Sequence, residues 1–156
     1  MYWIRVDNRL IHGQIIETWI PFTHTKLLVV VNDALAEDSL RQDIMSLAIP
    51  STITTAFVRV DEAASYLAKQ ANGNHHSEVM VLFASCVDAR GAYEHGLGFE
   101  ALNIGNLHYG PGKRQLCAHV AVTSEDETCL GFFNEHGVDL DFRCVPNDPV
   151  QVKNTW

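Results

Sequence analysis

The chain has 156 residues, of which 47% are hydrophobic and 19% charged, and its formal net charge is −8. This length and balance are typical of one globular domain with a proper hydrophobic core, here residues 1–156. A net negative chain is repelled by phosphate backbones, which argues against nucleic acid as a partner but leaves room for a local basic pocket.

The lack of a recognisable targeting signal and the cysteine usage both predict a cytoplasmic protein. The first ten residues lack the basic start and long apolar stretch of a signal peptide. No run of about 18 apolar residues could span a membrane. The four cysteines have no CxxC spacing and apolar neighbours, so we expect free buried thiols in a reducing compartment rather than disulfides or a metal site. They are Cys86, Cys117, Cys129 and Cys144.

Strand-like and helix-like segments alternate along the whole chain. Apolar or β-branched runs predict seven strands, at residues 1–6, 26–31, 52–60, 78–84, 99–105, 118–123 and 138–146. The segments between them predict helices, at residues 13–20, 33–50, 61–71, 86–95 and 124–137. Regular alternation of this kind predicts an α/β fold with a mostly parallel sheet and helices on both faces.

Two of these helices are expected to end at prolines. The first should stop at Pro21, whose ring cannot continue a regular helix. The second should end at Pro50. Its spacing gathers four apolar residues on one helical face, namely Leu40, Ile44, Leu47 and Ala48.

The first strand-to-helix turn, residues 7–13, carries the residues of chemical interest. Ligands of parallel sheets bind beyond the carboxyl ends of the strands, where this turn lies. His12 comes just before the helix that begins near Gly13, and a helix start carries unpaired N–H groups and a partial positive charge. That field disfavours the imidazolium, which leaves a neutral, nucleophilic ring at about pH 7, and it stabilises an anion at the same point.

Neighbouring residues add groups that suit a phosphoryl group. Arg9 lies in the same turn and Arg5 at the end of the strand, and an arginine fork can clamp phosphate oxygens. Gly13 lets a backbone approach closely, and Gln14 adds side-chain donors. Together with His12, these groups fit phosphoryl transfer to histidine.

From these residues alone, plainer interpretations remain open. A single histidine after a strand is more often a loop or capping residue than a nucleophile, and His12 could be one. Asp7 could simply form a surface ion pair with Arg9 or Arg5.

The stretch RVDNRLIHGQIIETW, residues 5–19, resembles the active-site signature of the IIB components of the mannose/fructose/sorbose family of the bacterial sugar phosphotransferase system. That signature runs Arg-x-Asp-x-Arg-Leu-x-His-Gly-Gln and is followed shortly by tryptophan. The likeness continues in the family's order over three more segments, at residues 29–50, 102–116 and 143–148. It departs at the turn Ala84-Ser85-Cys86 and at Asn106, where glycine is usual.

The resemblance implies a role for each residue of the turn. In the family, the matching histidine takes a phosphoryl group from a phosphohistidine on the IIA component and passes it to a sugar carried by the membrane components IIC and IID. By position, His12 would be the phosphohistidine, and Arg9 would stabilise the transferring group. The remaining residues would build the phosphate-binding loop: Arg5, Asp7, Gly13 and Gln14.

The resemblance also implies the setting of the protein. The sheet would be open, mainly parallel, of about seven strands, with one antiparallel edge strand. The partners would be IIA, the membrane components IIC and IID, and a sugar, with the protein placed at the inner face of the membrane through IIC and IID. We expect no metal and no cofactor, and a homo-oligomer is compatible with the sequence. The alternative function is a regulatory or binding module that is phosphorylated at His12 but transports no sugar.

Other chemistry-bearing residues give weaker signals. The loop with His108 and Lys113 would reach the site if its strand neighbours the first, although both residues are expected mainly in solvent. The pair His75-His76 predicts a solvent loop rather than a metal site, because adjacent side chains point apart. His119 lies in an apolar segment and is expected to be a core or interface residue. Cys86 follows a strand end, which might suggest the nucleophile of a cysteine phosphatase. The glycine-rich run that would cradle phosphate in such a loop is missing, so we do not expect this activity.

Overall fold

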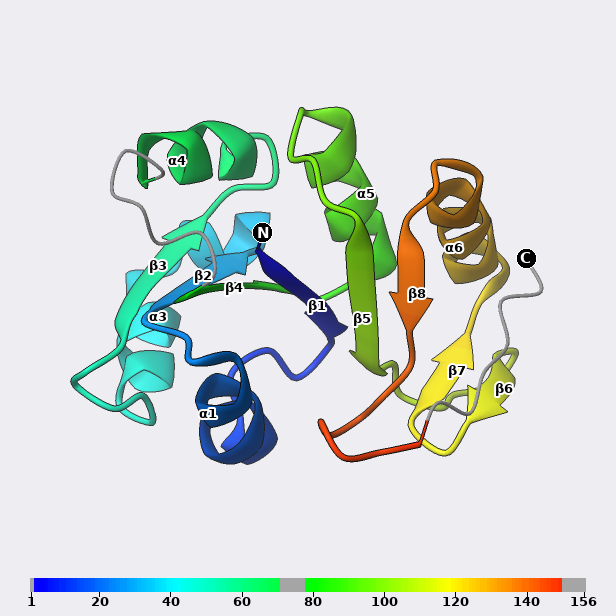
Figure 1. The fold of residues 1–156 in the computed structure, drawn as a ribbon, viewed down its shortest axis with the longest axis horizontal. Helices are drawn as coiled ribbons and strands as arrows, with labels where there is room; N and C mark the ends of the chain where they lie inside the picture. Colours follow the sequence, from blue (N-terminus) through cyan, green and yellow to red (C-terminus); the bar gives the residue numbers. More distant parts are fainter. Residues whose placement is uncertain (1, 71–77, 150–156) are drawn as a thin grey trace.

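A computed structural model describes residues 2–70 and 78–149 of the chain (Figure 1). Its centre is a six-stranded sheet in the order β3-β2-β4-β1-β5-β8, in which every pairing is parallel. The strands are β1 (Trp3–Asp7), β2 (Leu27–Val31), β3 (Thr54–Val58), β4 (Val79–Phe83), β5 (Ala101–Asn106) and β8 (Asp139–Asp141). The predicted fold class, an open and mainly parallel α/β sheet, is confirmed.

The antiparallel pairing lies outside this sheet. The edge strand β8 runs parallel to β5, with Ala101 opposite Asp139, so the predicted antiparallel edge strand and the count of seven are corrected. A separate antiparallel pair is formed by β6 (Arg114–Cys117) and β7 (Val120–Val122). The sequence around β6 is rich in glycine and polar residues, so β6 was not predicted as a strand and the hairpin was missed.

Helices cover both faces of the sheet (Figure 1). Three pack against one face: α4 (Ala63–Gln70), α5 (Cys86–Glu94) and α6 (Ser124–Glu135). The other face carries the π-helix η1 (Ile15–Trp19), α1 (Ile20–Thr23), α2 (Asp33–Ala36) and α3 (Ser39–Ser46). Across the described residues, no helix combines the length and apolar character needed to cross a bilayer.

The strands at the centre explain the two apolar layers. Along β2, Leu28 and Val30 point into the core cluster beneath η1 and α1, whereas Val29 and Val31 point into the cluster beneath α4, α5 and α6. All four are at most 1% exposed. Each buried aliphatic side chain of this kind contributes about 1.5–3 kcal/mol by leaving water. Two-sided burial is the reason that these strands read as continuous apolar runs.

The first helix does not stop at Pro21. The N–H of Ile20 bonds to the carbonyl of Ile15, five residues back, which is the wider π turn. Pro21 lacks an N–H and would crowd the preceding turn of a regular helix, so the wider turn accommodates it at the start of α1. The helix ends at His24, whose backbone is left-handed with φ 53°.

The helix predicted over residues 33–50 forms as two short helices, α2 and α3. Asp38 caps α3 by accepting from the N–H of Arg41 at 3.0 Å. The apolar face exists, but Leu40, Ile44 and Leu47 are 68%, 59% and 86% exposed. Helical periodicity identified a shared face; it could not say whether that face is covered.

Candidate active site

The turn after β1 places the candidate residues at the carboxyl end of the sheet. β1 lies between β4 and β5, and its pairing with β5 shifts register between Val6 and Asp7. A turn follows at once, closed by the N–H of Leu10 donating to the Asp7 carbonyl at 2.9 Å. Leu10 takes a left-handed backbone with φ 55° and buries its side chain to 5% exposure. The chain accepts this unfavourable conformation where it reverses into the helix.

The carboxylate of Asp7 is the hub of the site. It is fully buried, and Oδ1 accepts from the backbone N–H and Nε of Arg9 at 3.2 and 3.1 Å. Oδ2 accepts from Nη2 of Arg5 at 2.9 Å and Nη2 of Arg9 at 3.1 Å, and it contacts Nε2 of His12 at 3.0 Å. Asp7 is therefore a buried organiser and not a surface ion-pair partner.

These donors keep Asp7 ionised in spite of its burial. Burial by itself would raise the pKa of the carboxyl. The hydrogen bonds from His12 and Arg9 and the charge of Arg5 outweigh that effect and hold the pKa of Asp7 well below its usual range. A permanent carboxylate thus faces the imidazole.

One ring nitrogen of His12 contacts Asp7, and the other is left without a hydrogen-bond partner among the described residues. Its side chain is 17% exposed, and Nε2 faces the Asp7 carboxylate. A carboxylate only accepts hydrogen bonds, so the ring proton belongs on Nε2. Nδ1 then carries the lone pair, and among the described residues it has no hydrogen-bond partner. The pairing resembles the way a carboxylate orients the imidazole in other nucleophilic sites.

Arg9 brings positive charge to the surface of the turn. Its side chain is 31% exposed, and Nη2 also donates to Oε1 of Gln14 at 3.0 Å. Its Nη1 donates to no residue in the described part of the chain. The guanidinium is thus fixed on one edge and keeps donors for an anion on the other.

Arg5 supports the turn from inside the protein. Its side chain is fully buried and pairs with Asp7, with the side-chain oxygen of Asn103, and with the carbonyl of Cys144 at 3.1 Å. The guanidinium also lies 4.7 Å from the centre of the Trp19 ring. Burial lowers the pKa of Arg5, and the carboxylate of Asp7 opposes that shift. Direct contact of Arg5 with phosphate stays a prediction, which its burial disfavours.

Gly13 and Gln14 begin the helical backbone beyond the turn. Gly13 is exposed, and a Cβ at this position would meet no atom within 4 Å. Gln14 is half-buried, and its Oε1 accepts from Arg9 and from Sγ of Cys144, the latter at 3.5 Å. The structure therefore gathers all six predicted site residues at the end of β1, in the turn that follows it and at the start of the helix. A phosphate-binding role for Gly13 and Gln14 stays a prediction.

Asn103, Trp19 and Cys144 support the turn through contacts that were not predicted from the sequence. Asn103 sits in a buried strand and bridges Arg5 to the carbonyls of Asp141 and Arg143 at 3.2 and 3.0 Å. Trp19 donates from Nε1 to the carbonyl of Cys144 at 2.8 Å. A polar side chain inside an otherwise apolar strand was the available signal for Asn103. No local signal ties residue 144 to residue 19.

The loop after β5 adjoins the turn, as expected for a neighbouring strand. Asn106 donates from Nδ2 to Oδ1 of Asn8 at 2.8 Å, and its carbonyl accepts from the Asn8 N–H at 3.2 Å. Nδ1 of His108 lies 3.2 Å from Asn106 Nδ2, and Nζ of Lys113 donates to the His108 carbonyl at 2.9 Å. Contact of His108 or Lys113 with phosphate is not seen and stays a prediction.

The turn after β4 has a structural role. Ser85 caps α5 by accepting from the N–H of Asp88 at 3.0 Å. Cys86 is fully buried, and burial raises the pKa of its thiol well above the usual range. A protonated, enclosed thiol is no nucleophile, which agrees with the missing phosphatase loop. All four cysteines are free, as predicted, but only three are buried as expected, because Cys117 is half-buried.

Two further histidine predictions have different outcomes. His119 is exposed and lies in the turn between β6 and β7, so the expectation of a core histidine in a strand is wrong, whereas the interface alternative stays a prediction. The predicted strand at 118–123 starts only at Val120. The pair His75-His76 lies outside the described residues.

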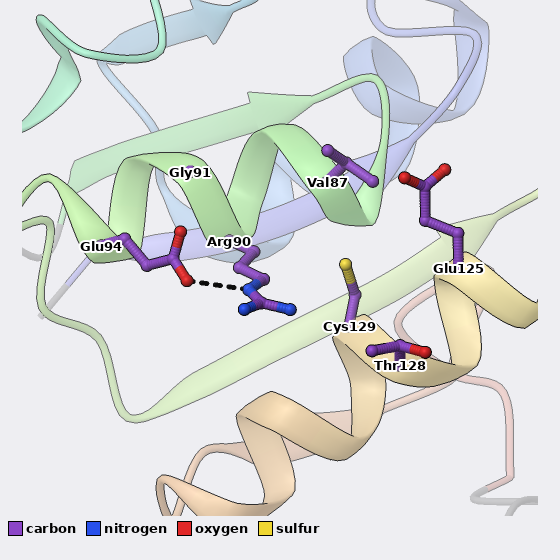
Figure 2. Close-up of a pocket in the computed structure, with 7 residues that line it drawn as sticks. All are labelled: Val87, Arg90, Gly91, Glu94, Glu125, Thr128 and Cys129. Atoms are coloured by element: carbon purple, nitrogen blue, oxygen red, sulfur yellow. Dashed lines mark hydrogen bonds and ion pairs between the residues drawn. The ribbon is translucent and has the colours of Figure 1, made fainter.

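A hollow of about 350 Å³ lies away from this turn, between α5 and α6 (Figure 2). Arg90 of α5 faces Cys129 of α6 across it, and Nε of Arg90 donates to Glu94 at 2.9 Å. The same guanidinium lies 4.4 Å from the centre of the Phe132 ring. Its charge is already paired and stacked, so the hollow offers little for an anionic ligand.

Comparison with known proteins identifies the family. The family model described as the PTS system sorbose subfamily IIB component matches residues 1–155. The chain is 31% identical over 145 residues to the N-acetylgalactosamine-specific phosphotransferase enzyme IIB component 1 of Escherichia coli K12, covering 92% of this chain and 90% of that protein. It is 30% identical over 146 residues to the sorbose-specific EIIB component of Klebsiella pneumoniae, covering 93% and 87%.

Solved structures agree with the sequence match. The crystal structure of the N-acetylgalactosamine-specific IIB component 1 from Escherichia coli superposes with a TM-score of 0.88 at 28% identity, over 98% of this chain and 99% of that one. The IIBSor domain of the sorbose permease from Klebsiella pneumoniae gives 0.84 at 28% identity, over 94% and 89%. The chain therefore belongs to the sorbose-subfamily IIB components of the phosphotransferase system, which take a phosphoryl group from IIA and transfer it to a sugar during uptake.

Proposed function

We propose that His12 is the phosphoryl acceptor of this IIB component and that Nδ1 is the nucleophilic atom. The observation that carries the proposal is the 3.0 Å contact between Nε2 and Asp7, which commits that nitrogen and leaves the lone pair on Nδ1. A side chain that is 17% exposed is accessible to a protein donor yet held in place. Arg9 binds the same carboxylate, and its Nη1 donors have no partner among the described residues.

Transfer then needs only groups of the turn and the two partners. Nδ1 attacks phosphorus, the donor N–P bond breaks, and its electrons return to the donor imidazole of IIA. The phosphorylated ring of His12 gains positive charge, which the Asp7 carboxylate stabilises through Nε2–H. Arg9 and the helix start at Gly13 hold the phosphoryl oxygens. We expect no metal or cofactor in this step.

In the second transfer, phosphorylated His12 becomes the donor and a sugar the acceptor. A sugar hydroxyl attacks phosphorus, the N–P bond breaks with its electrons returning to Nδ1, and a base on the membrane component takes the hydroxyl proton. The half-exposed position of Arg9 suits a relay, because a phosphoryl group held too tightly could not be passed on. Asp7 stays ionised throughout.

The family works with IIA, IIC, IID and a sugar. For this chain we infer a cytoplasmic protein, peripheral at the inner face of the membrane through IIC and IID. The sugar is proposed to be of the hexose type, since the named specificities of its relatives are N-acetylgalactosamine, mannose, fructose and sorbose. These four sugars form the test panel.

The test measures phosphate on the intact protein. The purified protein is incubated with phosphoenolpyruvate, the general phosphotransferase proteins and a IIA donor, and its mass is followed for wild type, His12→Ala and His24→Asn. His24 is an exposed histidine with a left-handed backbone that asparagine tolerates, so it is the matched control. One phosphate in wild type and His24→Asn, and none in His12→Ala, is expected. Phosphate that persists in His12→Ala contradicts the proposal.

Sugar transfer separates transport from regulation. Membranes containing IIC and IID are added to the phosphorylated protein with each sugar of the panel. Loss of protein phosphate with matching formation of a sugar phosphate supports the transport role. Retained protein phosphate with all four sugars favours the regulatory alternative.

We also propose that the exposed face of α3 pairs two copies of the chain. Leu40 and Ile44 lie on successive turns of α3, Leu47 follows as its C-cap residue, and all three are exposed. A two-fold axis would place this apolar patch of one copy against the same patch of another. Sedimentation of wild type and Leu47→Glu tests this. A dimer that becomes a monomer in the variant supports the pairing, and a wild-type monomer at high concentration contradicts it.

A further inference from the structure

Three metal-ligating side chains converge next to the turn that carries His12. His119 comes from the turn between β6 and β7, whereas Cys144 and Asp148 come from the segment after β8, coloured orange to red in Figure 1. One ligand atom from each lies within 4.8 Å of the other two. His119 is exposed, Cys144 is 3% exposed, and Asp148 is intermediate.

The donor set has the chemistry of a zinc site. Sulfur, imidazole nitrogen and carboxylate oxygen are the three ligand types that Zn²⁺ takes in proteins. Tetrahedral coordination needs these atoms about 3.6 Å apart, so the cluster must tighten by about 1 Å. His119 can supply that movement because it is exposed on a turn.

The carboxylate is already oriented for this role. Oδ2 of Asp148 accepts from the backbone N–H of Cys144 at 2.9 Å and of Val145 at 3.0 Å. These bonds hold the carboxylate against the turn that carries the thiol, which is how outer-shell contacts fix metal ligands. A thiolate and a carboxylate together balance the charge of a divalent cation.

We propose that His119, Cys144 and Asp148 form a binding site for a divalent transition metal of the zinc class. Cys144 Sγ, one imidazole nitrogen of His119 and one carboxylate oxygen of Asp148 bond to the ion, and water completes the tetrahedron. The thiol proton leaves to solvent on binding. Three protein ligands with one open position suit reversible rather than permanent binding.

The site is coupled to the phosphoryl turn through Gln14. Sγ of Cys144 donates to Oε1 of Gln14 at 3.5 Å, and the same oxygen accepts from Arg9 Nη2 at 3.0 Å. A metal-bound thiolate has no proton to donate, so this contact is lost and Gln14 turns away. Arg9 then loses a partner that fixes it. Metal binding is thus expected to slow phosphorylation of His12, a consequence that rests on the proposed function.

Cobalt is the probe, because a tetrahedral Co²⁺ ion bound to thiolate absorbs in the near ultraviolet and the visible. Co²⁺ is titrated into reduced protein in which His75 and His76 are replaced by asparagine, to remove competing imidazoles. The variants Cys144→Ser and His119→Ala are compared with Cys117→Ser, a half-buried cysteine outside the cluster. Saturation at one equivalent, and displacement by Zn²⁺, are expected in the starting protein and in Cys117→Ser.

Loss of the thiolate band in Cys144→Ser and at least tenfold weaker binding in His119→Ala would support the site. A band that persists in Cys144→Ser, or no band in the starting protein, would overturn it. The titration is repeated in His12→Ala, where the band should be unchanged, so the metal site is judged independently of phosphoryl transfer.

The coupling is tested as a ratio of phosphorylation rates with and without Zn²⁺. The rate is expected to fall at least tenfold on adding Zn²⁺ in the starting protein and to be unaffected by Zn²⁺ in Cys144→Ser. Equal inhibition of both proteins would contradict the coupling.

Discussion

Nε2 of His12 lies 3.0 Å from Oδ2 of Asp7, a fully buried carboxylate that also pairs with Arg9 of the turn and with Arg5 of β1. One acidic side chain thereby sets the tautomer of the nucleophile and the position of the cation beside it. The four residues between them in the sequence need only a tight turn to bring them together. Asp7 is consequently the residue on which both the fold and the chemistry of the turn depend.

Replacement of Asp7 by asparagine is expected to affect stability and transfer together. The Arg5 guanidinium would be left buried without its anion, at a cost of about 3–5 kcal/mol in unfolding free energy. His12 would lose its fixed tautomer, and phosphorylation should slow by about 10²-fold or more. Urea unfolding and the rate of phosphate uptake measure the two effects.

Asp141→Asn is the matched control for that change. Asp141 accepts from the N–H and Nε of Arg143 in the same Asp-x-Arg arrangement, but its side chain is 23% exposed. We expect a loss of at most about 1 kcal/mol and unchanged phosphorylation. Equal damage from the two substitutions would show that the role of Asp7 is not specific.

Stability should depend on pH through Asp7. Its folded-state pKa lies below the ordinary value of 3.8, so its contribution is present above that value and is lost as the pH falls toward the folded-state pKa. The difference in unfolding free energy between wild type and Asp7→Asn should therefore shrink as the pH falls below about 4. A difference that stays constant through this acid range would refute the lowered pKa.

Arg9→Gln should separate transfer from stability. The side chain is 31% exposed, and Asp7 keeps its bonds to Arg5 and His12, so the loss in unfolding free energy should be at most about 2 kcal/mol. Loss of a donor to the transferring group should slow phosphorylation by about 10²- to 10³-fold. Rapid quenching of the reaction with IIA measures it. Arg143→Gln, which removes the equivalent arginine at Asp141, should leave the rate unchanged.

Gly105→Ala tests the buried support of the turn. A Cβ at residue 105 would lie 1.8 Å from Cζ of Arg5, which cannot move without breaking its bonds to Asp7 and Asn103. We expect a loss of at least about 2 kcal/mol. In Gly98→Ala the new Cβ meets nothing within 4 Å, so urea unfolding of that variant should be nearly unchanged. Similar midpoints for the two variants would contradict the packing around Arg5.

Gly13→Ala should raise stability and lower activity. The new Cβ meets no atom within 4 Å of the folded chain, and alanine at a helix start reduces the entropy of the unfolded chain, which favours folding by about 0.4–1 kcal/mol. We expect the same Cβ to hinder the approach of the IIA donor to the neighbouring His12, so phosphate uptake should slow by about tenfold. Unimpaired uptake would show that close backbone approach at Gly13 is unnecessary.

Much of the fold and the centre of the site follow from local sequence. Strands buried on both faces, such as β2 and β4, can be recognised as continuous apolar runs in the sequence. The turn from Asp7 to Gly13 keeps its functional groups within seven residues. Local spacing was enough to bring His12, Arg9 and Asp7 together.

The contacts that support Arg5 could not be predicted from local sequence. Arg5 bonds to Asn103 and to the carbonyl of Cys144, which are 98 and 139 residues away along the chain. Only the pairing of β1 with β5 and the return of the chain after β8 create them. Similarly, the spacing of Leu40, Ile44 and Leu47 defines a face but contains no information on what covers it.

The most direct measurement identifies the phosphorylated atom. Protein labelled with ¹⁵N in its histidines is phosphorylated through IIA, and scalar coupling between ³¹P and the ring nitrogens is recorded. Coupling to Nδ1 of a single histidine, absent in His12→Ala, is the expected result. Coupling to Nε2, or to any other histidine, would contradict the assignment of Nε2 to Asp7 and of the nucleophilic lone pair to Nδ1.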